Sequence, residues 1–161
     1  MRILAICGSL QANSSNLRLL QQARASAPQG VELELYEGLA DLPHFNPELP
    51  EPSAVAELRR SVAQADALLI ATPEYGHSLP GSLKNAVDWL IGTGELESKL
   101  VAITSAVPAL ERGRLGLAAL RTTLGAVSAR IAFQEPIARG PDFERRIAEM
   151  TAVLVLAATQ R

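Results

Sequence analysis

Two segments of the sequence concentrate hydroxyl, amide and glycine residues that suit the binding of a polar ligand. The first is Gly8–Asn16, which runs from a short apolar stretch into a segment with helical spacing. The unpaired backbone N–H groups of a helix N-terminus attract an anion such as phosphate. Because the segment holds no lysine or arginine, we predict a phosphate bound by neutral donors, which are Ser9, Ser14, Ser15 and Asn16. The alternative is that these residues only cap the helix and turn the chain.

The second segment is Thr72–Leu90, with the sequence TPEYGHSLPGSLKNAVDWL. Its prolines and glycines predict a rigid loop that enters a helix at about Gly81. Such a loop holds backbone N–H and C=O groups at fixed spacing, which suits a planar heterocycle such as a flavin or a purine, with Tyr75 over one face. We predict no general base at His77, because the only other histidine is His44 and no serine–histidine–carboxylate pattern links them.

The single cysteine, Cys7, suggests a different chemistry, because phosphatases of the C-x5-R type place their nucleophile after the first strand. The position that would hold the arginine is occupied by Asn13. The cation that would activate the thiolate and bind the phosphate is therefore missing. We therefore interpret Cys7 as a small core residue. One cysteine also excludes an intramolecular disulfide and a multi-cysteine zinc site, and we predict no metal.

The elements that must position these loops alternate between short apolar runs and longer amphipathic stretches. We predict strands at 3–7, 31–36, 66–71, 100–104 and 127–133, and helices at 14–27, 54–65, 83–91, 115–124 and 143–158. The remaining long segment, 37–53, is predicted to be irregular. The alternation indicates an α/β fold, namely a flavodoxin-like three-layer sandwich with a five-stranded parallel sheet in the order 2-1-3-4-5. In that order a ligand binds beyond the carboxyl ends of the first and third strands, where both polar segments begin.

Composition is typical of one globular domain over residues 1–161, with 48% hydrophobic and 20% charged residues. A net charge of −2 and 4% aromatic residues argue against nucleic-acid binding. The apolar run 152–158 is too short to cross a membrane, and the N-terminal segment lacks the pattern of a signal peptide. We therefore expect a cytoplasmic protein without a membrane partner.

Two motifs resemble those of the NAD(P)H-dependent FMN reductase family, flavodoxin-like proteins that include quinone, chromate and azo-dye reductases. Gly8-Ser9-Leu10, followed by Ser14 and Asn16, is similar to the family's G-S-L-R-x-x-S-x-N. PEY at 73–75 and SLPGSLKNAVDW at 78–89 are similar to P-E-Y-N-x-S-x-P-G-x-L-K-N-A-I-D-W. The resemblance extends over essentially the whole chain.

The resemblance implies FMN as cofactor, with Ser9, Ser14 and Asn16 at its phosphate. It implies no catalytic side chain, since the flavin carries the redox chemistry. Two residues depart from the family's motifs: Gln11 stands where the family has an arginine, and Gly76 where it has an asparagine. The complete predicted FMN site is Ser9, Gln11, Ser14, Ser15, Asn16, Pro73, Glu74, Tyr75, Gly76, His77, Ser78 and Ser105.

The expected activity is an oxidoreductase that takes reducing equivalents from NADPH or NADH and passes them through FMN to a small acceptor. Free flavin, a quinone, an azo compound and a metal oxyanion all remain candidates, and Arg112 and Arg114 are candidates to contact the 2′-phosphate of NADPH. The alternative is a flavodoxin-type FMN electron carrier without NAD(P)H activity of its own. The resemblance further implies a homodimer or homotetramer, for which segments 37–52 and 84–90 are the predicted contacts.

Overall fold

A computed structural model describes residues 1–160 of the chain. Its five strands form one parallel sheet in the order β2-β1-β3-β4-β5, which confirms the predicted fold. The strands are β1 (Arg2–Cys7), β2 (Glu32–Tyr36), β3 (Ala67–Ala71), β4 (Leu100–Val107) and β5 (Arg130–Ala138).

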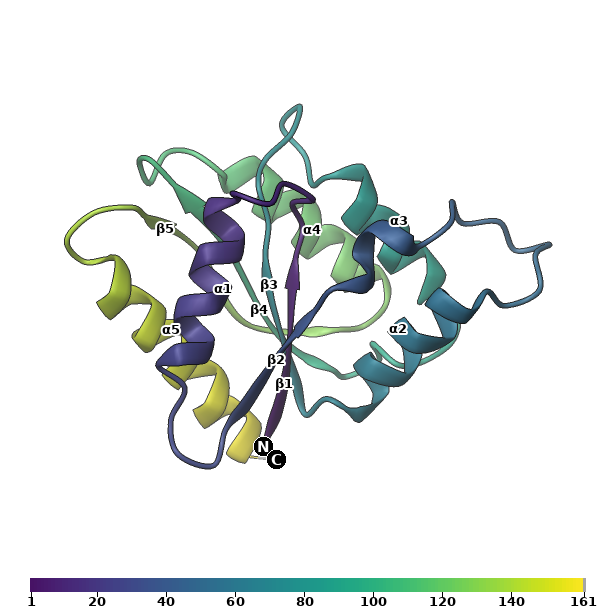
Figure 1. The fold of residues 1–161 in the computed structure, drawn as a ribbon, viewed down its shortest axis with the longest axis horizontal. Helices are drawn as coiled ribbons and strands as arrows, with labels where there is room; N and C mark the ends of the chain where they lie inside the picture. The colour runs from purple at the N-terminus through teal and green to yellow at the C-terminus, as the bar shows by residue number, and fades with distance from the viewer. Residues whose placement is uncertain (161) are drawn as a thin grey trace.

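Helices cover both faces of the sheet and make the three layers visible in Figure 1. Helices α1 (Ser15–Ala25) and α5 (Phe143–Thr159) pack on one face, where their leucines meet Ile3 and Ala5 of β1. The other face carries α2 (Ser53–Gln64), α3 (Gly81–Trp89) and α4 (Arg114–Ala126), packed against Leu4 and Ile6. Alternate residues of one strand therefore supply two separate cores.

Burial follows the position of each strand in the sheet. All five residues of the central strand β3, ALLIA, are buried, as expected for a strand covered on both faces. The edge strand β2 alternates apolar residues with Glu32 and Glu34. Strand β5 forms the opposite edge and contains Pro136, which an edge position tolerates because one side of the strand has no ladder partner.

Three segments differ from the sequence-based expectation. Strand β4 ends at 107 instead of 104, so that Ser105 lies in the strand and not in the loop after it. Strand β5 begins at residue 130 instead of 127, because α4 continues to Ala126 and the chain then turns through Ser128, which has a positive φ of 58°. It ends at 138 instead of 133, because pairing with β4 continues as far as Val107 and Ala138. In the segment expected to be irregular, Gly38–Asp41 forms a 3-10 helix that buries Leu39 against the core.

We predict that Gly8→Ala destabilises the fold by about 2 kcal/mol, because the new methyl group overpacks a closed junction. A Cβ at Gly8 would lie 2.4 Å from Thr72 Oγ1 and 2.9 Å from Thr72 Cβ. The matched control is Gly125→Ala in α4, where a Cβ would meet no described heavy atom within 4 Å and where alanine favours the helix by about 0.5 kcal/mol. Urea unfolding of both variants measures the difference, and equal midpoints would contradict the prediction.

Candidate functional site

The two polar loops lie next to each other at the carboxyl edge of the sheet, at the top of the view in Figure 1. Strands β1 and β3 pair in parallel, and the Gly8 N–H then donates to the Ala71 carbonyl at 2.8 Å. Strand β4, on the other side of β3, brings its own last residues and the 108–113 loop to the same edge. The strand order thus brings together three loops that are far apart in the sequence.

The first loop is shaped by its own serines. Ser14 is the N-cap of α1, and its Oγ accepts hydrogen bonds from the backbone N–H groups of Asn16 at 3.2 Å and Leu17 at 3.4 Å. Ser9 Oγ accepts from the Gln11 N–H at 3.3 Å. The capping role considered as an alternative is therefore present. It does not preclude phosphate binding, because a hydroxyl that accepts a hydrogen bond keeps its proton for donation.

Asn16 joins this loop to the end of β4. Its side-chain oxygen accepts a hydrogen bond from the Ala106 N–H at 2.8 Å, and the residue is buried. The carbonyl end of the amide is thus engaged across the sheet edge, while its NH2 group carries the remaining donors. The contact fixes the N-terminus of α1 against the residue that follows Ser105. The role of Asn16 at a phosphate stays a prediction.

Glu74 in the β3–α3 loop caps a different helix. One carboxylate oxygen accepts a hydrogen bond from the Gly116 N–H in the first turn of α4 at 2.9 Å. This bond, strengthened by the positive end of the helix dipole, lowers the pKa of the Glu74 carboxyl, and His77 at 3.4 Å acts in the same direction. Gly116 favours the approach, because a Cβ there would make a tight contact of 3.1 Å with Glu74 Cβ.

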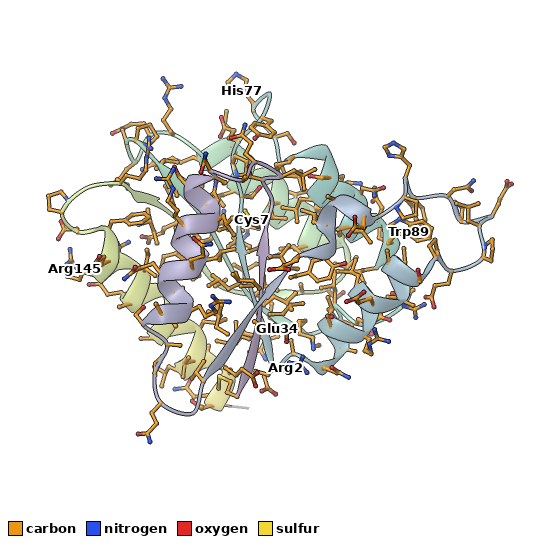
Figure 2. The ribbon with its side chains drawn as sticks, viewed as in Figure 1. Arg2, Cys7, Glu34, His77, Trp89 and Arg145 are labelled. Carbon is orange, nitrogen blue, oxygen red and sulfur yellow. The ribbon has the colours of Figure 1, made fainter. Side chains whose placement is uncertain are left out.

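Tyr75 and Ser78 close a two-residue turn at the tip of this loop. Each donates its backbone N–H to the other's carbonyl at 3.0 Å. Both central residues have positive φ, 56° at Gly76 and 62° at His77, as a tight hairpin turn requires. Glycine adopts this conformation without strain. Figure 2 shows His77 at the outer tip, and Tyr75 is 49% exposed, so the tyrosine ring is accessible from solvent.

A cavity of about 260 Å³ lies between the loop that follows β3 and the end of β4 with its following loop, and we call it the β3–β4 cavity. It brings together three of the predicted residues, and Arg112 from the following turn also lines it. Ser9 and Gln11 instead line a separate cavity of about 280 Å³ on the β2 side of the first loop. The lining of the β3–β4 cavity is Pro73, Glu74, Ser105, Ala106, Val107, Pro108, Arg112 and Gly113.

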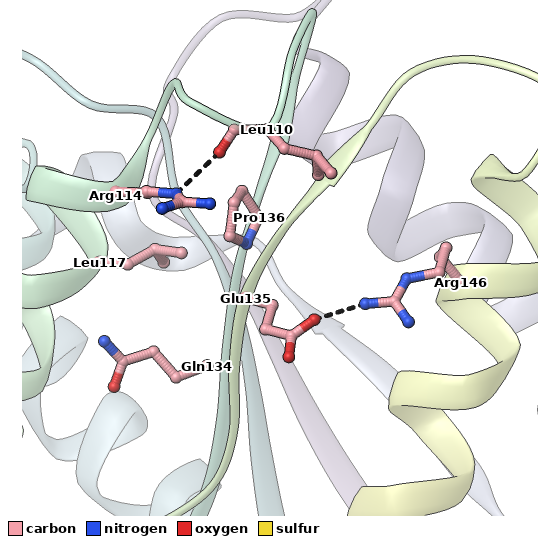
Figure 3. Close-up of a pocket in the computed structure, with 7 residues that line it drawn as sticks. All are labelled: Leu110, Arg114, Leu117, Gln134, Glu135, Pro136 and Arg146. Atoms are coloured by element: carbon pink, nitrogen blue, oxygen red, sulfur yellow. Dashed lines mark hydrogen bonds and ion pairs between the residues drawn. The ribbon is translucent and has the colours of Figure 1, made fainter.

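A larger cavity of about 550 Å³ lies beside the site, between α4, β5 and α5 (Figure 3). None of the predicted FMN residues lines it. Arg114, which together with Arg112 was a candidate for a 2′-phosphate, lines this cavity and donates from Nε to the Leu110 carbonyl at 3.0 Å. The two arginines therefore face different cavities. In the larger one, Arg146 is neutralised by an ion pair with Glu135 at 2.5 Å.

Cys7 is only partly buried: it packs against the core under α1 and α5 and also lines the cavity on the β2 side of the first loop. Burial raises its pKa, and its Sγ lies 4.0 Å from the Ser14 hydroxyl. A raised pKa opposes thiolate formation, which a cysteine phosphatase requires. Within residues 1–160 no group of three or more histidine, cysteine, aspartate or glutamate side chains is arranged to hold a metal ion. No helix in the same range is long and apolar enough to cross a membrane.

The donor chemistry at this edge fits FMN. A helix N-terminus surrounded by hydroxyls suits a phosphate, and a recess between two chain segments suits a flat ring. Fold and site together define a flavodoxin-like protein with polar loops and a cavity at the carboxyl edge of its sheet. Residues 1–138 match the model of the family described as NADPH-dependent FMN reductase, and the chain belongs to that family.

Several characterised proteins are similar to this chain. An NAD(P)H-dependent FMN reductase of Pseudomonas aeruginosa is 42% identical over 92 residues, which are 55% of this chain and 49% of the relative. A quinone reductase of Escherichia coli is 34% identical over 94 residues, 56% of this chain and 50% of the relative. The matched region thus spans about half the length of these curated relatives. The solved structure of FerB, a flavoenzyme NAD(P)H:(acceptor) oxidoreductase from Paracoccus denitrificans, has a TM-score of 0.79 at 26% identity and covers 98% of this chain and 95% of its own.

We predict that the hydrogen bond from Gly116 to the Glu74 carboxylate stabilises the protein at neutral pH and that this contribution is lost in acid. A carboxyl whose pKa is lowered on folding contributes stability that is complete above its ordinary pKa of 4.5 and is lost as the pH falls through the lowered value. Glu74→Gln keeps an acceptor oxygen but cannot ionise. The stability difference between wild type and E74Q should therefore shrink between pH 7 and pH 3 in urea unfolding of the apoprotein. A difference that does not change with pH would contradict this account.

Proposed function

We propose that the protein binds FMN and uses NAD(P)H to reduce a small acceptor, such as a free flavin, a quinone, an azo compound or a metal oxyanion. The observation that carries the proposal is the convergence of the serine-rich N-terminus of α1 with the β3–β4 cavity at one edge of the sheet. The first offers donors to a phosphate, and the second offers a recess to a ring. The names of the similar reductases support the same assignment.

When bound, FMN supplies the hydride and electron chemistry. In this proposal the Ser9 and Ser14 hydroxyls and the first backbone N–H groups of α1 hold its phosphate. Pro73, Glu74 and Ser105 form the walls around its ring, with the Asn16 bridge keeping the walls in register. Arg112 lines the same cavity and brings a positive charge that favours the phosphate-bearing nicotinamide nucleotide. We assign no side chain as a general acid or base.

The decisive experiment is a flavin titration followed by reduction. Purified protein is mixed with FMN, and binding is followed by the quenching of flavin fluorescence at micromolar concentration. The FMN complex is then treated with NADPH or NADH without oxygen, and loss of the flavin absorbance is recorded, followed by turnover with quinone, azo and metal-oxyanion acceptors. Absence of FMN binding would refute the proposal. FMN binding without oxidation of either nucleotide would instead identify a flavodoxin-type carrier.

We predict that the charge at position 11 tunes the affinity for FMN. Gln11 is exposed in the first loop, at the position where the family has an arginine. Gln11→Arg should tighten FMN binding about tenfold, and Gln11→Glu should weaken it by a similar factor, since a charge-assisted bond to phosphate contributes about 1.5 kcal/mol. Riboflavin, which lacks the phosphate, is the control ligand and should bind all three proteins alike. An equal response of both ligands would place the phosphate elsewhere.

We further propose that residues 1–161 form one domain that works in the cytoplasm as a homodimer or homotetramer, with contacts from the 37–52 loop and α3. Part of the apolar content of that loop is used within the chain: Leu42 is buried, and the Pro43 carbonyl accepts hydrogen bonds from Asn85 at 2.9 Å and Trp89 at 2.8 Å. Phe45, which stacks edge-on against Trp89 with ring centroids 5.0 Å apart, is 41% exposed, and Leu49 is 44% exposed. These two side chains remain available to a second copy.

We predict that Leu49→Ser lowers the oligomeric state measured by light scattering coupled to size-exclusion chromatography, because it removes apolar area from the proposed contact. Leu156→Ser is the matched control, since Leu156 is 60% exposed on α5 and lies outside the proposed contact. A wild-type monomer would refute the contact. Dissociation by L156S but not by L49S would move the contact to α5.

A further inference from the structure

We propose that Arg139 supplies the positive charge for the FMN phosphate that the family's motif places at position 11 and that this chain lacks there. The inference rests on the proposed FMN binding and adds to it a residue from the opposite end of the sequence. Arg139 follows β5, and 124 residues separate it from its contact in the first loop. Sequence comparison of the loop alone therefore does not find it.

The position of Arg139 is fixed by the sheet. Its backbone N–H donates to the Val107 carbonyl at 2.8 Å, which continues the pairing of β5 with β4 by one residue. From there its side chain reaches the first residue of α1, and Nη1 donates to Ser15 Oγ at 3.4 Å. Ser15 is adjacent to Ser14, the N-cap at which we expect the phosphate. The Arg139 guanidinium, which comes from the end of β5, therefore lies at the N-terminus of α1.

This guanidinium has no carboxylate partner among residues 1–160, whereas those of Arg2, Arg59, Arg145 and Arg146 form ion pairs with glutamate or aspartate. Its contact with Ser15 lies at the long end of the hydrogen-bond range, and Arg139 itself is exposed. An anion bound at the N-terminus of α1 therefore competes with only one weak contact. Guanidinium and phosphate form strong, frequently bidentate hydrogen bonds, so the exchange favours the phosphate.

Arg18 is the other arginine near the loop, and its geometry indicates a different role. Its Nη2 donates to the Asn13 carbonyl at 3.0 Å, so this side chain fastens the loop backbone to α1. We therefore assign loop positioning to Arg18 and phosphate binding to Arg139. With Gln11 uncharged, Arg139 adds one exposed cation to a site whose other donors are neutral.

The test compares FMN and riboflavin binding to Arg139→Gln. FMN should bind about tenfold more weakly than to wild type at low ionic strength, while riboflavin affinity stays unchanged, because only FMN carries the phosphate. The difference for FMN should shrink at about 1 M salt, where charges are screened within roughly 3 Å. Arg139→Lys should recover most of the affinity. Thermal unfolding of each variant checks that the fold is intact.

The matched control is Arg24→Gln, which removes the same charge from the far end of α1, about 14 Å away at 1.5 Å per residue. It should leave the affinity for both flavins unchanged. If wild type and R139Q bind FMN equally, the role of Arg139 is refuted while FMN binding itself stands. If R18Q but not R139Q weakens FMN, the cation is Arg18. If wild type binds no FMN, the proposed function fails together with this inference.

Discussion

The parallel pairing of β1 with β3 is the constraint on which the site depends. Residues 3–7 pair with 67–71 in continuous register, and the chain then leaves both strands at the same height. Gly8 continues the contact by donating to Ala71, and the absence of a side chain there lets Thr72 approach to a distance that a Cβ would not permit. Because both strands are central and buried on both faces, a change of register would move a whole row of core side chains. The sheet thus fixes the spacing of the two loops independently of the polar contacts between them.

Polar side chains then connect the loops across the sheet edge. The Asn16 side chain links the start of α1 to the end of β4 by a hydrogen bond. The Glu74 side chain links the β3–α3 loop to the start of α4 in the same way. Both contacts satisfy backbone N–H groups near loop or helix starts, which otherwise lack a partner inside the protein. Removal of either side chain would leave a donor unsatisfied and would also release one wall of the β3–β4 cavity. These bonds serve stability and site geometry at once.

How much the sequence reveals depends on the range of the interaction. The strands and helices around Ile3–Cys7 and Ala67–Ala71 could be predicted because apolar runs and helical spacing are local patterns. The end of β5 could not, because it is set by pairing with β4 and not by its own residues. The cap of α4 by Glu74 was missed for the same reason, although a glycine at position 116 inside a helical pattern marks a close approach. No pattern in the residues around Arg139 predicts its contact with Ser15, because 124 residues separate the two.

The charged residues near the site come from parts of the sequence that are distant from the first loop. The first loop contains only neutral groups, so the backbone can adopt the turn and helix start without repulsion or an unpaired charge. Cations reach the same edge on long side chains anchored elsewhere: Arg139 from the end of β5 and Arg112 from the loop after β4. A charge on a long exposed side chain has little desolvation cost without a ligand and can move onto an anion when one binds. If Arg139 binds the phosphate as we propose, the shape of the first loop and the recognition of the ligand's charge depend on different parts of the chain, and an uncharged Gln11 is compatible with a cation at the phosphate.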